Sequence, residues 1–149
     1  MTTPDRPLFL SSAVASFARV SLRQLQYWDE TGLIFPKQTR HRRQYTIEKM
    51  VLIAVIGQLV RKGVGLNKIR VMANSLCRIV SRKVAERCCL PKMAWLITDG
   101  YDLHVAPSMI ALALRLELAE HPIVAVPLQN YILRALVEAG EGRLIEPCS

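Results

Sequence analysis

The stretch SLRQLQYWDETGLIFP, from Ser21 to Pro36, combines an apolar stripe with a face of cationic and amide side chains. The apolar residues recur every three positions, at Leu22, Leu25 and Trp28. This spacing predicts an amphipathic helix that runs through about Glu30. Ser21 is a favourable N-cap, and Gly32 can end the helix because glycine adopts a left-handed backbone without strain.

A shorter helix is expected before this one, capped by Ser11 or Ser12 and joined to it by a tight turn at Arg19-Val20. Two short helices connected in this way describe a helix-turn-helix, whose second helix enters the major groove of DNA. Arginine can bond the acceptor atoms of guanine, and glutamine can bond adenine. The expected contacts are to bases from Arg23, Gln24 and Gln26, and to phosphates from Ser21 and Tyr27.

The following segment, LIFPKQTRHRRQYT at residues 33–46, has apolar ends around a cationic middle and predicts a β hairpin. Its cations lie within seven residues and repel one another unless a polyanion neutralises them. We therefore expect the hairpin to bind the phosphate backbone, as the wing of a winged helix does, with an affinity that falls steeply with salt. The expected phosphate contacts from this hairpin are Lys37, Arg40, Arg42, Arg43 and Tyr45.

Three segments, SLRQLQYWDETGLIFP, RRQY and MVLIAVIGQLVRKGVGLNKIR, together resemble the MerR family of winged-helix transcription regulators over about residues 8–75. The motif RQLxYW, which begins at Arg23, is similar to one branch of that family. The matching positions are Leu25, Tyr27, Trp28, Asp29, Gly32, Leu33, Pro36, Arg43, Tyr45, Gly63, Leu66, Ile69 and Arg70. The resemblance implies binding to double-stranded DNA as a homodimer, with RNA polymerase as a candidate partner.

Four positions depart from the family pattern. Gln26 replaces a usual arginine, and Arg19 replaces the usual turn glycine, so the turn must form without a left-handed glycine. Gly65 replaces a capping serine or threonine, and Arg42 replaces an aromatic residue. These changes leave DNA binding as the expectation but alter the set of residues that can contact it.

The rest of the chain changes in character after Pro91. Before it, a helix capped by Thr46 is expected over about 47–61, and another from about Leu66 into the eighties. After it, WLITDGYDLHV predicts a hairpin that turns at Asp99-Gly100. The expected elements that follow are a helix from Ser108 to Glu120, a strand at 122–128 and a helix at 130–139.

These elements predict an α+β chain in three parts. A winged helix-turn-helix domain, mostly α with a small β wing, is expected at 8–75, followed by a connecting helix at 76–92. A small ββαβα module is expected at 93–149, where exposed strand edges favour dimerisation, with ligand sensing as the alternative. Residues 1–92 carry 17 Lys and Arg against 5 Asp and Glu, whereas residues 93–149 carry 3 against 7. The basic part is the one expected to meet a polyanion.

The composition bears on membrane association, on metal or cofactor binding and on the role of the cysteines. No apolar run reaches the length of about 18–20 residues that a membrane span requires, so a cytoplasmic, nucleoid-associated protein is expected, with no membrane partner. The cysteines form no CxxC pair, and neither a metal nor a cofactor is expected. Buried thiols are the favoured interpretation for the four cysteines, with thiol or metal sensing as the alternative for Cys77, Cys88 and Cys89.

The sequence therefore predicts a sequence-specific DNA-binding transcriptional regulator rather than an enzyme. His104 and His121 are isolated, and no catalytic set of residues accompanies them. Two alternatives use the same basic surface. One is an architectural or recombination-directing DNA-binding protein that does not control RNA polymerase. The other is a protein-interaction adaptor whose basic face binds an acidic partner.

Overall fold

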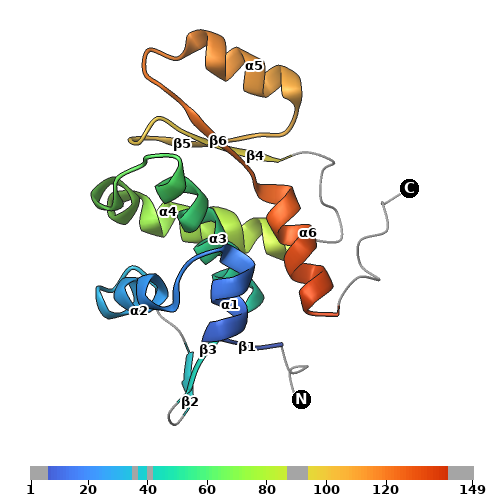
Figure 1. Ribbon diagram of the computed structural model, residues 1–149. Helices are drawn as coiled ribbons and strands as arrows, with labels where there is room; N and C mark the ends of the chain where they lie inside the picture. Colours follow the sequence, from blue (N-terminus) through green and yellow to red (C-terminus); the bar gives the residue numbers. More distant parts are fainter. Residues whose placement is uncertain (1–6, 35–36, 40–41, 87–93, 141–149) are drawn as a thin grey trace.

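The computed structural model describes residues 7–34, 37–39, 42–86 and 94–140. These residues form six helices and two three-stranded sheets (Figure 1). The helices are α1 (Ser11–Ala18), α2 (Leu22–Glu30), α3 (Ile47–Arg61), α4 (Leu66–Ala85), α5 (Met109–Leu118) and α6 (Leu128–Glu138). The strands are β1 (Phe9–Leu10), β2 (Lys37–Thr39), β3 (Arg42–Tyr45), β4 (Trp95–Thr98), β5 (Leu103–Ala106) and β6 (Val124–Pro127). The chain is therefore a mixed helix and sheet protein, as the sequence predicted.

The turn between α1 and α2 forms without glycine, because Arg19 itself adopts the left-handed backbone, with φ 56° and ψ 44°. This conformation costs an L-residue about 1–2 kcal/mol, so other contacts must hold it. Arg61 of α3 provides them: its Nη1 donates to the carbonyl oxygens of Ala18 and Arg19 at 3.3 and 3.1 Å. The helix-turn-helix is thus stabilised from outside by the third helix.

A glycine in α3 allows that close approach. A Cβ at Gly57 would lie only 2.9 Å from the Cγ1 of Val20, which follows the turn. Helix interiors disfavour glycine by about 1 kcal/mol relative to alanine, so packing space is the reason for its presence here. The turn between the first two helices therefore packs directly on the α3 backbone at this point.

The first sheet has the strand order β1-β3-β2, with Phe9 opposite Tyr45 and Lys37 opposite Gln44. The strand β1 was not predicted. Because the chain enters α1 directly from this strand, Leu10 occupies the N-cap position and no side chain caps the helix. The prediction that Ser11 or Ser12 would cap it was wrong.

Helix α3 lies at the centre of the molecule and is buried on nearly all sides. Thr46 caps it, with the Lys49 amide donating to its hydroxyl at 3.3 Å, as predicted. Gly63, with φ 93°, follows it before α4 begins. Its buried residues are Ile47, Met50, Val51, Leu52, Ile53, Ala54, Val55, Ile56, Gly57 and Leu59.

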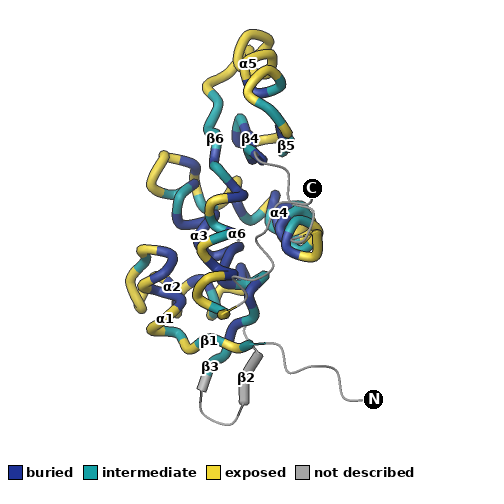
Figure 2. The backbone as a smooth tube through the Cα atoms, turned by 90° about the vertical axis from the view of Figure 1, so that its right-hand side faces the viewer, coloured by how far each residue is buried: buried dark blue, intermediate teal, exposed yellow. Residues whose placement is uncertain are grey.

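The second sheet, with the order β5-β4-β6, lies between two layers of helices (Figure 1). Alternate side chains of its strands point to opposite faces. Leu96 and Val126 join the main core with α3 and α4, whereas Ile97 and Ala106 form a small separate cluster with Leu112 of α5. Helix α5 therefore covers the outer face of this sheet through few buried residues, and much of its surface is exposed (Figure 2).

The last helix belongs to the main core. It begins at Leu128, two residues before its predicted start, and packs along α3. At its first turn, the buried Gln129 accepts a hydrogen bond from the Ala94 amide at 2.8 Å. The residues of this helix in the main core are Leu128, Ile132, Ala135 and Leu136. The C-terminal part of the chain thus shares its hydrophobic core with the helix-turn-helix.

Across the described ranges, no helix combines the length and the hydrophobicity that crossing a lipid bilayer would require. In the same residues, no three His, Cys, Asp or Glu side chains gather where they could hold a metal ion. Cys77 is a half-buried thiol, and the other three cysteines lie outside the described residues.

Candidate nucleic-acid interface

Helix α2 begins with a reciprocal pair of hydrogen bonds. The Gln24 amide donates to the Ser21 hydroxyl, and the Ser21 amide donates to Gln24 Oε1, each at 3.0 Å. This capping box satisfies two backbone donors that the start of a helix leaves unpaired. Ser21 and Gln24 therefore start the helix. The side-chain nitrogen of Gln24, Nε2, takes no part in the capping box and can donate to a ligand.

The outward face of α2 carries three of the predicted residues. Arg23, Gln26 and Tyr27 are exposed, whereas Leu25 and Trp28 are buried. Since successive residues of an α-helix are separated by about 100°, Arg23 and Tyr27 lie within about 40° of each other on the side opposite the core. Helix α2 thus presents a cation, an amide and a phenol to the outside.

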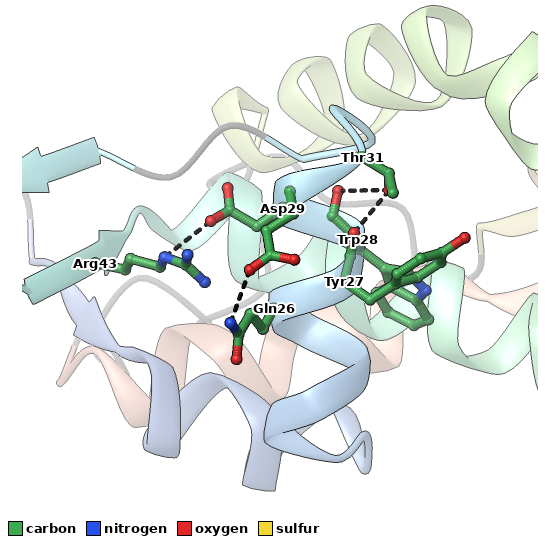
Figure 3. A network of polar contacts seen from close by, with 7 residues as sticks. Gln26, Tyr27, Trp28, Asp29, Thr31 and Arg43 are labelled. Atoms are coloured by element: carbon green, nitrogen blue, oxygen red, sulfur yellow. Dashed lines mark hydrogen bonds and ion pairs between the residues drawn. The ribbon is translucent and has the colours of Figure 1, made fainter.

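An acidic residue shares this face. Glu30 accepts a hydrogen bond from Gln26 Nε2 at 2.7 Å, one helical turn along α2 (Figure 3). The sequence interpretation did not anticipate this pair, although the spacing of four residues was a visible signal. This bond uses one of the two hydrogens on Gln26 Nε2, so the second hydrogen and Oε1 remain available to a base.

The hairpin is tied to α2 by an ion pair. Arg43 Nε of β3 lies 2.9 Å from Asp29 Oδ2, with the Asp29 side chain 9% exposed and the Arg43 side chain 30% exposed (Figure 3). Burial raises the pKa of Asp29 above its ordinary value of 3.8, and the charge of Arg43 offsets part of this rise. The pair fixes the hairpin relative to the helix and leaves the Arg43 side chain partly exposed.

Tyr45 does not belong to an exposed surface. Its side chain is 0% exposed, so it cannot reach a phosphate in this conformation, and we assign it to the core instead. Burial raises its pKa above 10.0, and the nearby Ser11 side chain offsets part of that rise. Among the described residues its hydroxyl makes no hydrogen bond of good geometry. Alternation along β3 places Tyr45 on the same face as Arg43, the face that meets α2 through Asp29, and Arg42 and Gln44 on the other.

The remaining hairpin cations are only partly described. Lys37 lies in β2 and Arg42 in β3, and their backbones pair across the hairpin with Gln44 and Thr39. Arg40 lies outside the described residues, as do the side chains of Lys37 and Arg42. Their contacts therefore remain predictions from the sequence.

Helix α4 holds the other end of α2. Arg70 Nη1 donates to the Thr31 carbonyl at 3.0 Å, and Arg70 Nη2 donates to the Thr31 hydroxyl at 2.7 Å. Arg70 is one of the positions that match the family pattern, but nothing in its spacing indicated a partner 39 residues away. Arg70 therefore positions the end of the helix that carries Arg23 and Gln26.

Comparison with known families agrees with this geometry. Residues 9–76 match the profile described as MerR HTH family regulatory protein. These residues, a little under half of the chain, are therefore similar to the helix-turn-helix domain of MerR-family regulators. Members of this family bind DNA, regulate transcription and typically act as dimers. No curated protein matches the chain.

Proposed function

We propose that this chain is a sequence-specific regulator of transcription that places α2 in the major groove and its basic hairpin on the phosphate backbone. The observation that carries the proposal is the Asp29–Arg43 ion pair. It joins the hairpin to the helix whose outward face holds Arg23, Gln26 and Tyr27. A helix and a cationic ribbon fixed to each other can contact a groove and its bordering phosphates together.

The residues divide by their chemistry. Arg23 is the proposed base-reading cation, and Gln24 and Gln26 offer amides to base edges. Ser21 and Tyr27 offer hydroxyl groups to phosphates without adding charge. The hairpin contacts to the phosphate backbone are Lys37, Arg40, Arg42 and Arg43.

We further propose that the protein acts as a homodimer through its C-terminal part, residues 93–149. Helix α5 supports this proposal, because it exposes more than half of several large apolar side chains. Apolar surface gathered on one element is typical of a protein–protein contact. These side chains are Met109, Ile110, Leu114, Leu116 and Leu118. The edge strands β5 and β6 offer a second way to pair two copies.

Selection of bound duplexes from a random pool, followed by fluorescence anisotropy at several salt concentrations, tests the proposal. We expect one enriched motif with two-fold symmetry and a linear fall of log affinity with log salt. Arg43→Gln should reduce that slope by about one unit. Tyr45→Phe is the matched control, because its buried side chain should leave the slope unchanged.

Other outcomes of the same experiment identify the alternatives. A cooperative ladder on long DNA without an enriched motif would instead support an architectural role. Failure to bind any duplex at low salt would favour an adaptor that meets an acidic protein. An equal loss of slope in Arg43→Gln and Tyr45→Phe would mean that both changes disturb the hairpin rather than remove a phosphate contact.

A further inference from the structure

A groove of about 550 Å³ lies between α4 and the β4–β5 hairpin, on a part of the molecule that the DNA proposal does not use. Its volume falls within the range of about 300–1,000 Å³ that is usual for small-molecule sites. Met72, Leu103 and Val105 contribute apolar side chains to its lining. The groove can therefore accept a ligand with an apolar body.

Two apolar side chains at the edge of the groove are mostly exposed. Val71 is 85% exposed and Tyr101 is 68% exposed, and both line the groove. The ammonium group of Lys68 lies 4.8 Å from the centre of the Tyr101 ring, which orients that ring. These contacts offer an aromatic or aliphatic ligand a partly formed binding surface.

The same groove carries an excess of positive charge. Arg78 and Arg82 are four residues apart on one face of α4, where like charges destabilise a helix. Arg78 donates to the neutral hydroxyl of Ser75 at 3.3 Å, and no acidic partner neutralises Arg82 within the described residues. Asp102 also lines the groove, but it forms no ion pair with either arginine there.

The helix dipole explains only part of this arrangement. Cations in the last turn of a helix are favourable, which accounts for Arg82 and for Lys83, itself paired with Glu86 at 3.5 Å. It does not account for Arg78, which lies two turns from the end of α4. Nor does it account for the exposed Val71 and Tyr101 that line the same groove.

We propose that this groove binds a small organic anion with an apolar body, such as an aromatic carboxylate. The carboxylate would be held by the guanidinium groups of Arg78 and Arg82, and the apolar body would contact Val71, Met72 and Tyr101. Guanidinium and carboxylate groups form short, charge-assisted hydrogen bonds in pairs. The site is independent of the proposed DNA interface, so the two proposals can fail separately.

Titration calorimetry with two matched probes tests the site on the full chain. The first probe is 1-naphthylacetate, and the second is 1-naphthylacetamide, which has nearly the same shape without the charge. We expect the anion to bind and the amide to bind at least about tenfold more weakly. Equal affinity for the two probes, or no binding of the anion, would overturn the proposal.

Three variants sharpen the test. The double variant Arg78→Gln and Arg82→Gln should weaken binding of 1-naphthylacetate by about tenfold or more. Val71→Asp should also weaken it, because the new carboxylate repels the anion from an exposed position that folding does not need. Arg115→Gln removes an exposed cation of α5 outside this groove and should leave binding unchanged.

Two results would contradict the assignment of the ligand. An equal loss of 1-naphthylacetate affinity in Arg115→Gln would show that only net charge matters. A fall of about two units in the salt slope of DNA binding in the double arginine variant would assign Arg78 and Arg82 to phosphates of a duplex instead.

Discussion

Helices α2 and α5 are of similar length but expose opposite kinds of surface. Helix α2 buries Leu25 and Trp28 and turns mostly polar side chains outward, although Leu22 of the predicted apolar stripe is also exposed. Helix α5 has the sequence MIALALRLEL, yet Leu112 is the one residue of it that is buried. The more hydrophobic of the two helices is therefore the one that leaves its apolar residues in water.

This difference separates two kinds of partner. A polar face is already satisfied by water, so only a partner of matching charge and hydrogen-bonding pattern can displace that water favourably. An apolar face gains free energy from any complementary apolar surface, at about 25 cal/mol per Å² removed from water. We infer that α2 faces a polyanion and that α5 faces protein.

The largest expected effect concerns the exposed apolar residues of α5. Replacing Ile110 and Leu114 together with Asp should raise the dissociation constant of the dimer by about a hundredfold or more, because burial of each side chain contributes about 1.5–3 kcal/mol. Sedimentation equilibrium across a concentration series measures this change. Val137→Asp, at a similarly exposed position of α6, is the control and should leave the dimer intact. A dimer that persists in the double variant would assign self-association to another surface, such as the strand edges.

The α2 side of the comparison depends most on Arg23. Arg23→Ala should cost about 1–3 kcal/mol at the selected duplex and should relax the base preference at one position of each half-site. Anisotropy titrations against the selected duplex and its single-base variants measure both effects. Arg115→Ala removes a cation from α5 and should change neither. Uniform weakening on all duplexes would show that Arg23 contacts the backbone and not a base.

A smaller effect is expected where α4 holds α2. Arg70→Gln removes two hydrogen bonds to Thr31 and should lower the free energy of unfolding by about 1–2 kcal/mol. Affinity for the selected duplex should fall as well, because the end of α2 is then less fixed. Thr31→Ser keeps both acceptors and is the control for urea denaturation and anisotropy. If Arg70→Gln lowers stability and leaves the affinity unchanged, α4 does not position the reading face.

The smallest expected effect compares two carboxylates, one from each part of the molecule. The pKa of Asp29 is raised by burial, so its contribution to stability is greatest below its ordinary pKa of 3.8 and is lost as pH rises through its folded pKa. The pKa of Asp99 is lowered by hydrogen bonds from the Asp102 and Tyr101 amides. Its contribution is therefore present above 3.8 and is lost as pH falls through its folded pKa.

Urea denaturation of the wild type, Asp29→Asn and Asp99→Asn over about pH 3–6 measures these two contributions. The stability of the wild type relative to Asp29→Asn should fall as pH rises. The stability of the wild type relative to Asp99→Asn should rise over the same interval. Slopes of the same sign in both comparisons would contradict the difference in environment between the two carboxylates.

Features that depend on neighbouring residues could be predicted from the sequence. Ser21 as an N-cap, Thr46 as an N-cap and Gly32 with positive φ all follow from local chemistry that the structure confirms. The hairpin that turns at Asp99-Gly100 follows from the same kind of reasoning. These features require only residues within about four positions of each other, so their signals are complete in a short segment.

Features that join distant segments could not be predicted. The strand β1 pairs with β3 through Phe9 and Tyr45, and the hydrogen bonds from Arg70 to Thr31 join residues 39 positions apart. The burial of Tyr45 and the Asp29–Arg43 ion pair likewise depend on which face of β3 meets α1 and α2. Spacing within one segment carries no information on a partner in another segment. In the sequence, a cation that forms a partly buried ion pair therefore cannot be distinguished from one that binds a phosphate.

The shared core has a practical consequence for protein engineering. Helix α6 fills space beside α3, and Arg134 of α6 donates to the Phe17 carbonyl of α1 at 3.5 Å. A chimera that joins residues 9–76 to a foreign C-terminal half would leave that space empty and uncover apolar side chains of α3. Transplants of DNA specificity into or out of this protein should therefore exchange individual side chains on α2 and carry the remainder of the chain unchanged.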